Sequence, residues 1–185
     1  MNTDKHFTPL SPNPKILQPL PGEALNPKIP KSPNPKISPS LPALFLRLAL
    51  GLGYSWEVAD RLGILGANGK PHVGWGDWSH FMEYARQVMG FLPAPLISVF
   101  AVIATIGEGA FGLLLLIGLY TRVAAIGSSI LSLVFAVAMA LSMGIESPIG
   151  YSVFTVSAAS LLLATLPDST WSLDARLKKH TFKNK

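Results

Sequence analysis

A single carboxylate, Glu108, lies inside an apolar stretch of about 30 residues. This stretch runs from Phe91 to Tyr120 and contains no other Asp, Glu, Lys or Arg. An acid in a membrane helix costs about 2.5–3.5 kcal/mol on insertion scales, so it usually has either a partner or a function. A positioned carboxylate can exchange a proton with a bound substrate. Glu108 is therefore the candidate catalytic residue.

Arg47 and Tyr54 occur in a second apolar segment, nearer the N-terminus. At about 100° per residue, both fall on one stripe of a helix. By the same periodicity, Glu108 lies on a helix face that consists mostly of small residues. Small residues let two helices approach closely in lipid. The two predicted stripes are Arg47, Gly51, Tyr54 and Val58, and Ala101, Ala104, Thr105, Glu108, Gly112 and Leu115.

In antiparallel helices, Arg47 near the start of one and Glu108 near the end of the other would share a leaflet. We expect an intramembrane ion pair between them, with Tyr54 adding a hydrogen bond. The same three residues alternatively form a polar site that handles protons or binds a ligand. The sequence leaves both interpretations open.

The composition is that of a membrane protein. The 185 residues are 49% hydrophobic and 14% charged, which is unusual for a soluble domain. The chain has no cysteine, so disulfides and thiolate metal sites are excluded. The net charge of +5 comes from basic residues in the two tails. We therefore expect the lipid bilayer as a partner, and no nucleic acid.

Four segments are long and apolar enough to be membrane helices, which need about 20 residues each. They are Leu41–Val58, Pro93–Tyr120, Val123–Ile145 and Pro148–Leu166. Short connections make the later segments antiparallel neighbours. The predicted fold is an all-α membrane protein, with a four-helix antiparallel bundle over residues 41–167.

The flanking segments differ from the bundle. Residues 1–40 are rich in proline and lysine and repeat SPNPKI, which predicts a disordered arm that is retained rather than cleaved. Residues 168–185 form a basic tail. Lys and Arg total eleven in the tails and the 120–122 turn, against three in the opposite connections. The positive-inside rule places both termini in the cytoplasm of a multi-pass protein.

The connection at residues 59–92 is long enough to hold a structure of its own. Asp77 is placed to cap a short amphipathic helix, which we expect at the membrane interface in the first external loop. Trp75 and Trp78 fit either an aromatic belt or a ligand-stacking role. His72, His80 and Glu83 lack the spacing of a metal site, so no metal is predicted.

Several stretches together resemble the DoxX-like family of small four-helix membrane proteins. They are ALFLRLALGLGYSWE, the segment FLPAPLISVFAVIATIGEGAFGLLLLIGLYTRVAA and WSLDARL after the last span. The resemblance covers roughly residues 41–177. It implies a bacterial inner-membrane protein, in a family whose members include a subunit of thiosulfate:quinone oxidoreductase. GWGDWSHFMEYARQVMGFLPAP and SPIGYSVFTVSAASLLLA are similar to regions of that subunit.

The resemblance implies a redox-associated, quinone-facing subunit or anchor. A quinone head needs hydrogen-bonding groups in an apolar slot, and Glu108, Arg47 and Tyr54 are the constellation within the spans that could provide them. No histidine lies in a predicted span, so the electrons would come from a partner subunit, with no covalently bound cofactor. An accessory or assembly protein without catalysis and a small proton-coupled transporter remain alternatives. The expected protein partner is a redox subunit or, in a homo-oligomer, a second copy of the chain.

Overall fold

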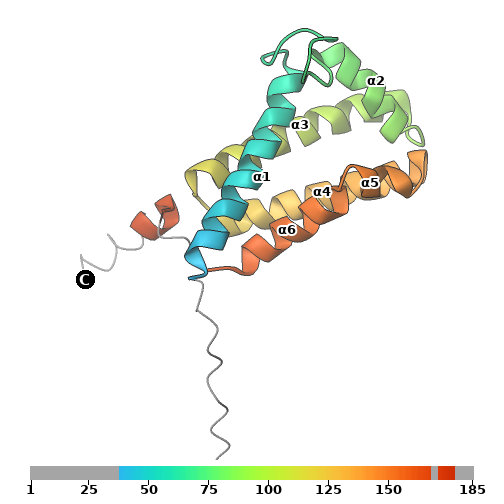
Figure 1. Ribbon diagram of the computed structural model, residues 1–185. Coiled ribbons are helices and arrows are strands. Elements are labelled where there is room, and N and C mark those ends of the chain that lie inside the picture. The colour runs from blue at the N-terminus through green and yellow to red at the C-terminus, as the bar shows by residue number, and fades with distance from the viewer. Residues whose placement is uncertain (1–37, 168–170, 178–185) are drawn as a thin grey trace, which may run out of the picture. The chain divides into compact units, whose positions relative to one another are not determined.

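The computed structural model describes residues 38–167 and 171–177 (Figure 1). Throughout these ranges the regular structure is helical. The helices are α1 (Ser40–Arg61), α2 (Trp78–Val88), α3 (Ala94–Ile117), α4 (Thr121–Met143), α5 (Glu146–Gly150) and α6 (Val153–Thr165). The proline-rich arm up to residue 37 and residues 168–170 and 178–185 of the basic tail lie outside the described residues.

Helices α1 and α3 pack antiparallel through small residues. Gly51 of α1 lies against Gly112 of α3, where a Cβ on Gly51 would approach the Gly112 carbonyl oxygen to 3.1 Å. Close backbone contact of this kind is what small residues permit between membrane helices. The buried face of α3 confirms the predicted stripe: it consists of Ile97, Ala101, Ala104, Thr105, Glu108, Gly112 and Leu115.

Helix α4 packs against α3 and α6, and α1 also contacts α6. Serines join α4 to α6, where the Ser157 hydroxyl donates to the Ser129 carbonyl oxygen at 2.9 Å. The apolar core between these helices includes Leu50, Leu115, Ala125 and Leu163. The start of α1, the turn between α3 and α4 and the end of α6 therefore lie at one end of the bundle, where all three line a common cavity.

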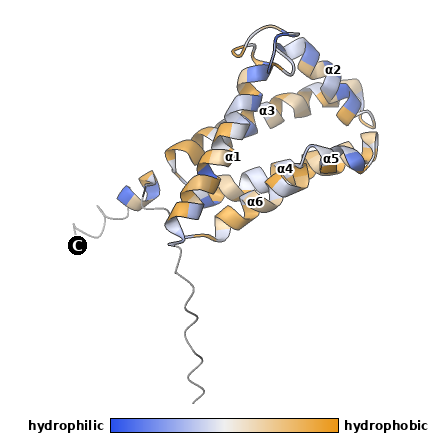
Figure 2. Cartoon of the chain, viewed as in Figure 1, coloured by the Kyte–Doolittle hydropathy of each residue, from blue (hydrophilic) through white to orange (hydrophobic). Residues whose placement is uncertain are grey.

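Helices α3 and α4 are long and apolar enough to cross a membrane, and α6 is a shorter apolar helix. Only 33% and 39% of the most apolar windows of α3 and α4 are buried, so both helices expose large apolar surfaces, as helices in contact with lipid do. Figure 2 shows hydrophobic residues along α3, α4 and α6, and hydrophilic residues on α2, at the end of α1 beside it and near the C-terminus. The protein is a helical membrane protein.

The predicted fourth span, Pro148–Leu166, is wrong as a continuous helix. The segment consists of α5 and α6, which are separated by Tyr151 and Ser152. Ser152 has a left-handed backbone, with φ of 57°, which a regular α-helix cannot contain. Gly150, a weak helix former, precedes this break. The 13 residues of α6 span only about 20 Å, less than the hydrocarbon core of a bilayer.

The predicted short amphipathic helix is confirmed as α2. Asp77 caps it, because its side chain accepts from the backbone N–H of His80 at 3.0 Å. Phe81, Met82, Ala85 and Val88 are buried. The Ser142 hydroxyl of α4 donates to the Val88 carbonyl oxygen at 2.7 Å, which holds the end of α2 against α4.

Candidate functional site

Glu108 forms a buried ion pair with Arg61. Arg61 Nη1 lies 2.6 Å from Glu108 Oε2, and the two side chains are 3% and 9% exposed. Arg61 Nη1 also donates to the Thr105 hydroxyl at 3.1 Å. Thr105 in turn donates to the Ala101 carbonyl oxygen one turn earlier, at 2.8 Å. The buried acid on α3 is thus neutralised by the last residue of α1.

The predicted pair of Arg47 with Glu108 is wrong. Helices α1 and α3 cross at Gly51 and Gly112, so the start of α1 lies beside the end of α3. Arg47 accordingly packs against Gly118, the residue that ends α3, and donates to the Trp171 carbonyl oxygen at 3.1 Å. Arg61, the last residue of α1, lies at the opposite end of the helix and forms the ion pair with Glu108.

Tyr54 also differs from its predicted role. Its hydroxyl lies 2.7 Å from Ser132 Oγ and donates to the Ser128 carbonyl oxygen at 3.2 Å. Both partners are on α4, so the Tyr54 hydroxyl joins α1 to α4. The structure therefore separates the three predicted site residues into three places.

Aromatic rings cover the Arg61 guanidinium. Its central carbon lies 4.2 Å from the ring centre of Phe81 and 5.4 Å from that of Trp75. Both distances are in the range of cation–π attraction. Arg61 Nε is buried and has no hydrogen-bond partner among the described residues. The site thus keeps one charged donor available inside an apolar and aromatic enclosure.

A second carboxylate lies near the pair. Glu57, half-buried on α1, interacts electrostatically with both Arg61 and Glu108. Two acids therefore share one guanidinium, and full ionisation would leave the cluster with an excess negative charge. Tyr84 of α2 interacts with Glu57 and Arg61, and burial raises the pKa of its hydroxyl. This hydroxyl donates to Met139 Sδ at 3.9 Å.

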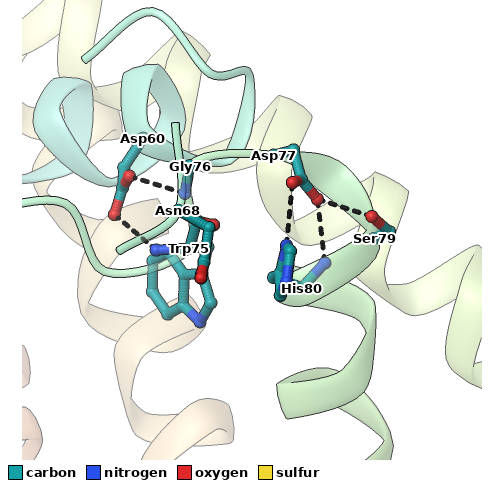
Figure 3. A network of polar contacts seen from close by, with 7 residues as sticks. All are labelled: Asp60, Asn68, Trp75, Gly76, Asp77, Ser79 and His80. Atoms are coloured by element: carbon teal, nitrogen blue, oxygen red, sulfur yellow. Dashed lines mark hydrogen bonds and ion pairs between the residues drawn. The ribbon is translucent and has the colours of Figure 1, made fainter. Parts of the chain in front are cut away.

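Asp60 fixes the loop that carries Trp75 (Figure 3). Its buried carboxylate accepts from the backbone N–H groups of Gly74, Trp75 and Gly76 at 2.8, 3.1 and 3.0 Å. The loop also depends on Gly76, whose φ is 73° and which has no room for a side chain beside Asn68. Asp60 precedes Arg61 in the chain. The end of α1 therefore carries the Arg61 guanidinium and also fixes the loop whose Trp75 ring packs over it.

Asp77 anchors the start of α2 on the same loop (Figure 3). Hydrogen bonds from the Ser79 hydroxyl, the His80 backbone N–H and the His80 ring hold the pKa of this carboxyl well below its ordinary value. His80 therefore belongs to the cap. In the described part of the chain, no group of three or more His, Cys, Asp or Glu side chains could hold a metal ion.

The sequence contains a signal for Arg61. The stripe through Arg47, Gly51, Tyr54 and Val58 continues three residues further to Arg61, on the same face of the helix. A predicted helix end at Val58 places Arg61 in the connection, whereas α1 continues to Arg61. Thr105 lies on the predicted stripe of α3, but periodicity alone does not indicate its hydrogen bond to an arginine.

The fold and the site define a helical membrane protein with a shielded ion pair beside an amphipathic helix. A family described as "TQO small subunit DoxD" matches residues 44–185. The chain belongs to this family, which confirms the resemblance seen in its motifs. The family takes its description from the small subunit of thiosulfate:quinone oxidoreductase. Searches of curated proteins and of solved structures found no match.

Proposed function

We propose that this protein is the quinone-facing membrane subunit of a thiosulfate:quinone oxidoreductase-like complex, and that Arg61 and Glu108 form its quinone site. The observation that carries the proposal is the buried ion pair in a chain of this family. Ionisable groups inside membrane segments are expensive and commonly serve a function. A purely structural role would not need a second acid, Glu57, beside the pair.

The chemistry follows from what reduction of a quinone requires. A quinone takes up two electrons and two protons to become a quinol. The chain has no cysteine, and its histidines lie outside α3, α4 and α6, so a partner subunit supplies the electrons. The Arg61 Nε–H donates to a quinone carbonyl oxygen, and the Phe81 and Trp75 rings provide apolar surroundings for the quinone ring. Glu108, with Glu57 nearby, transfers protons.

Entry of a quinone requires a movement of α2. Arg61 and Glu108 are nearly inaccessible, and the loop and first turns of α2 cover them. Helix α2 is held by its cap at Asp77 and by Ser142 at its other end. Opening would have to separate Phe81 and the other buried side chains of α2 from the bundle, which costs free energy. In this proposal the cover over Arg61 is the entrance.

The proposal places the protein in the plasma membrane as four antiparallel spans, with α5 and α6 together making the fourth. The positive-inside rule puts both termini in the cytoplasm. The start of α1, the turn between α3 and α4 and the end of α6 share one end of the bundle, in agreement with an even number of crossings. Glu108 then lies near the middle of α3, within the membrane, and Arg61 reaches it from the external end of α1.

The test measures quinone reduction by the native complex, which is purified by means of a tag on this subunit. Complexes that contain the wild-type subunit, Glu108→Gln or Glu83→Gln are compared. Glu108→Gln keeps the shape of the acid and removes its charge, so we expect at least a tenfold loss of activity, in the range typical of general acid–base catalysis. Glu83 is exposed on α2, and its variant should retain activity.

Assembly of the complex is measured in the same samples. If Glu108→Gln assembles and reduces quinone at the normal rate, the acid is structural and the protein is an accessory subunit. Purification of the protein without a redox partner, together with proton-driven solute uptake in vesicles, would instead support a transporter.

A further inference from the structure

A cavity of about 600 Å³ with a mixed polar and apolar lining lies at the end of the bundle opposite the Arg61 site. Arg47 of α1 and Arg122 of α4 line it, together with Thr121 and Asp174. The remaining lining includes apolar residues such as Val123, Leu163 and Leu166. The cavity thus combines two guanidinium groups with an apolar wall.

The segment at residues 171–177 helps to build this cavity. The Asp174 carboxylate accepts from the backbone N–H groups of Tyr120 and Thr121, each at 2.9 Å. It therefore caps the start of α4 from a position 53 residues later in the chain. Because Asp174 takes these two donors, they are unavailable to a ligand. Its charge offsets that of Arg47, with which it interacts electrostatically, and the exposed Arg122 adds a positive charge to the cavity.

Thr121 provides an independent observation at the same place. The residue is 9% exposed, and its hydroxyl has no hydrogen-bond partner among the described residues. Buried hydroxyls in native proteins are nearly always hydrogen-bonded. A ligand oxygen in the cavity would satisfy this hydroxyl. The group that suits two guanidiniums and a hydroxyl is an oxyanion such as a phosphate.

We propose that the cavity binds one anionic phospholipid through its phosphodiester group. A phosphodiester carries a single negative charge, which complements the positive charge of the exposed Arg122. Val123 lines the cavity yet is 64% exposed, so an acyl chain can leave the cavity along the apolar outside of α4. Basic pockets between membrane helices bind lipid headgroups in this way. The site is independent of the proposed quinone chemistry.

The experiment compares binding of phosphatidylglycerol and phosphatidylcholine to the full chain in detergent, by native mass spectrometry and by melting temperature. Arg122→Gln is the main variant, because Arg122 is exposed and its loss does not threaten folding. Arg86→Gln, which removes an exposed charge from α2, is the matched control. Thr121→Val removes the buried hydroxyl and keeps the shape of the side chain.

We expect phosphatidylglycerol to bind wild type and Arg86→Gln alike, and to raise their melting temperatures more than phosphatidylcholine does. Arg122→Gln should bind it about tenfold more weakly, as expected for loss of a hydrogen bond to a charged group. Thr121→Val should bind it about threefold more weakly. Equal effects of the two lipids, or equal losses in Arg122→Gln and Arg86→Gln, would overturn the proposal. So would full stabilisation by inorganic phosphate without lipid.

Discussion

Arg47 and Arg61 lie 14 residues apart on the same face of α1, and only Arg61 reaches Glu108. Fourteen residues of helix correspond to about 21 Å, so the two arginines lie near opposite ends of the bundle. An arginine side chain is long enough to extend back from a helix end into the apolar region, with its stem against apolar neighbours. Helical periodicity predicts that Arg47 and Arg61 share one face of α1. Which of them pairs with Glu108 depends on where α1 and α3 cross.

A double-mutant cycle tests this assignment. Arg61→Met should leave Glu108 buried without its cation and cost about 3–5 kcal/mol of stability, and adding Glu108→Leu should restore most of it. The measurement is unfolding of the detergent-solubilised protein, in which the two substitutions should be strongly non-additive, with a coupling energy of about 3 kcal/mol or more.

Arg47→Met combined with Glu108→Leu is the control for the cycle. These residues lie at different places in the bundle, so their effects should add, within about 0.5 kcal/mol. Strong coupling of Glu108 with Arg47, and none with Arg61, would show that the observed register of α1 against α3 is incorrect.

Helix α2 and its loop are the element that shields the ion pair. Two aspartates fix this element: Asp60 binds the loop, and Asp77 caps the helix. The cap was predictable, because Asp77 precedes an amphipathic pattern. The role of Asp60 was not, because a carboxylate that accepts from backbone groups 14–16 residues away leaves no periodic signal in the sequence.

Asp60→Ala should release the loop. The change leaves three backbone N–H groups without their acceptor and should cost about 2–4 kcal/mol. Hydrogen–deuterium exchange at residues 74–76 should become much faster, while exchange in α3 and α4 stays unchanged. Asn68→Ala, which removes one exposed hydrogen bond to the Trp75 carbonyl oxygen, should have only a small effect. Equal effects of the two substitutions would contradict the account of Asp60.

The Asp77 cap should weaken in acid. Hydrogen bonds lower the pKa of Asp77 below its ordinary value of 3.8, so the cap stabilises α2 above that pH and is lost as the pH falls further. The melting temperature of Asp77→Ala should therefore lie below that of wild type at neutral pH, and the difference should shrink below about pH 4. Asp77→Asn, which keeps an acceptor and does not titrate, should remove most of this pH dependence.

For the whole molecule, the sequence was sufficient to predict an all-helical membrane protein, its family and the buried face of α3. Apolar length and periodicity carry that information directly. The break before α6 was not predictable in this way, because Tyr151 and Ser152 leave the segment uncharged while Ser152 takes a left-handed backbone. The proposal that α5 and α6 jointly complete a fourth crossing therefore needs a direct test.

Topology reporters provide that test. A reporter fused after Lys185 should be active only if it functions in the cytoplasm, and one inserted near Gly69 only if it functions outside. Both results follow from four crossings and from the distribution of Lys and Arg. An external C-terminus would show that α5 and α6 do not cross the membrane.

The most direct test of the central claim is photolabelling of the purified native complex with an azidoquinone, followed by mapping of the labelled peptides. The account predicts label on residues around Arg61, Phe81 and Glu108, with excess unlabelled quinone preventing it and Glu108→Gln reducing it. Labelling confined to the partner subunit, or to the exposed lipid-facing surface of α4 around Leu133 and Val137, would contradict a quinone site at the Arg61–Glu108 pair.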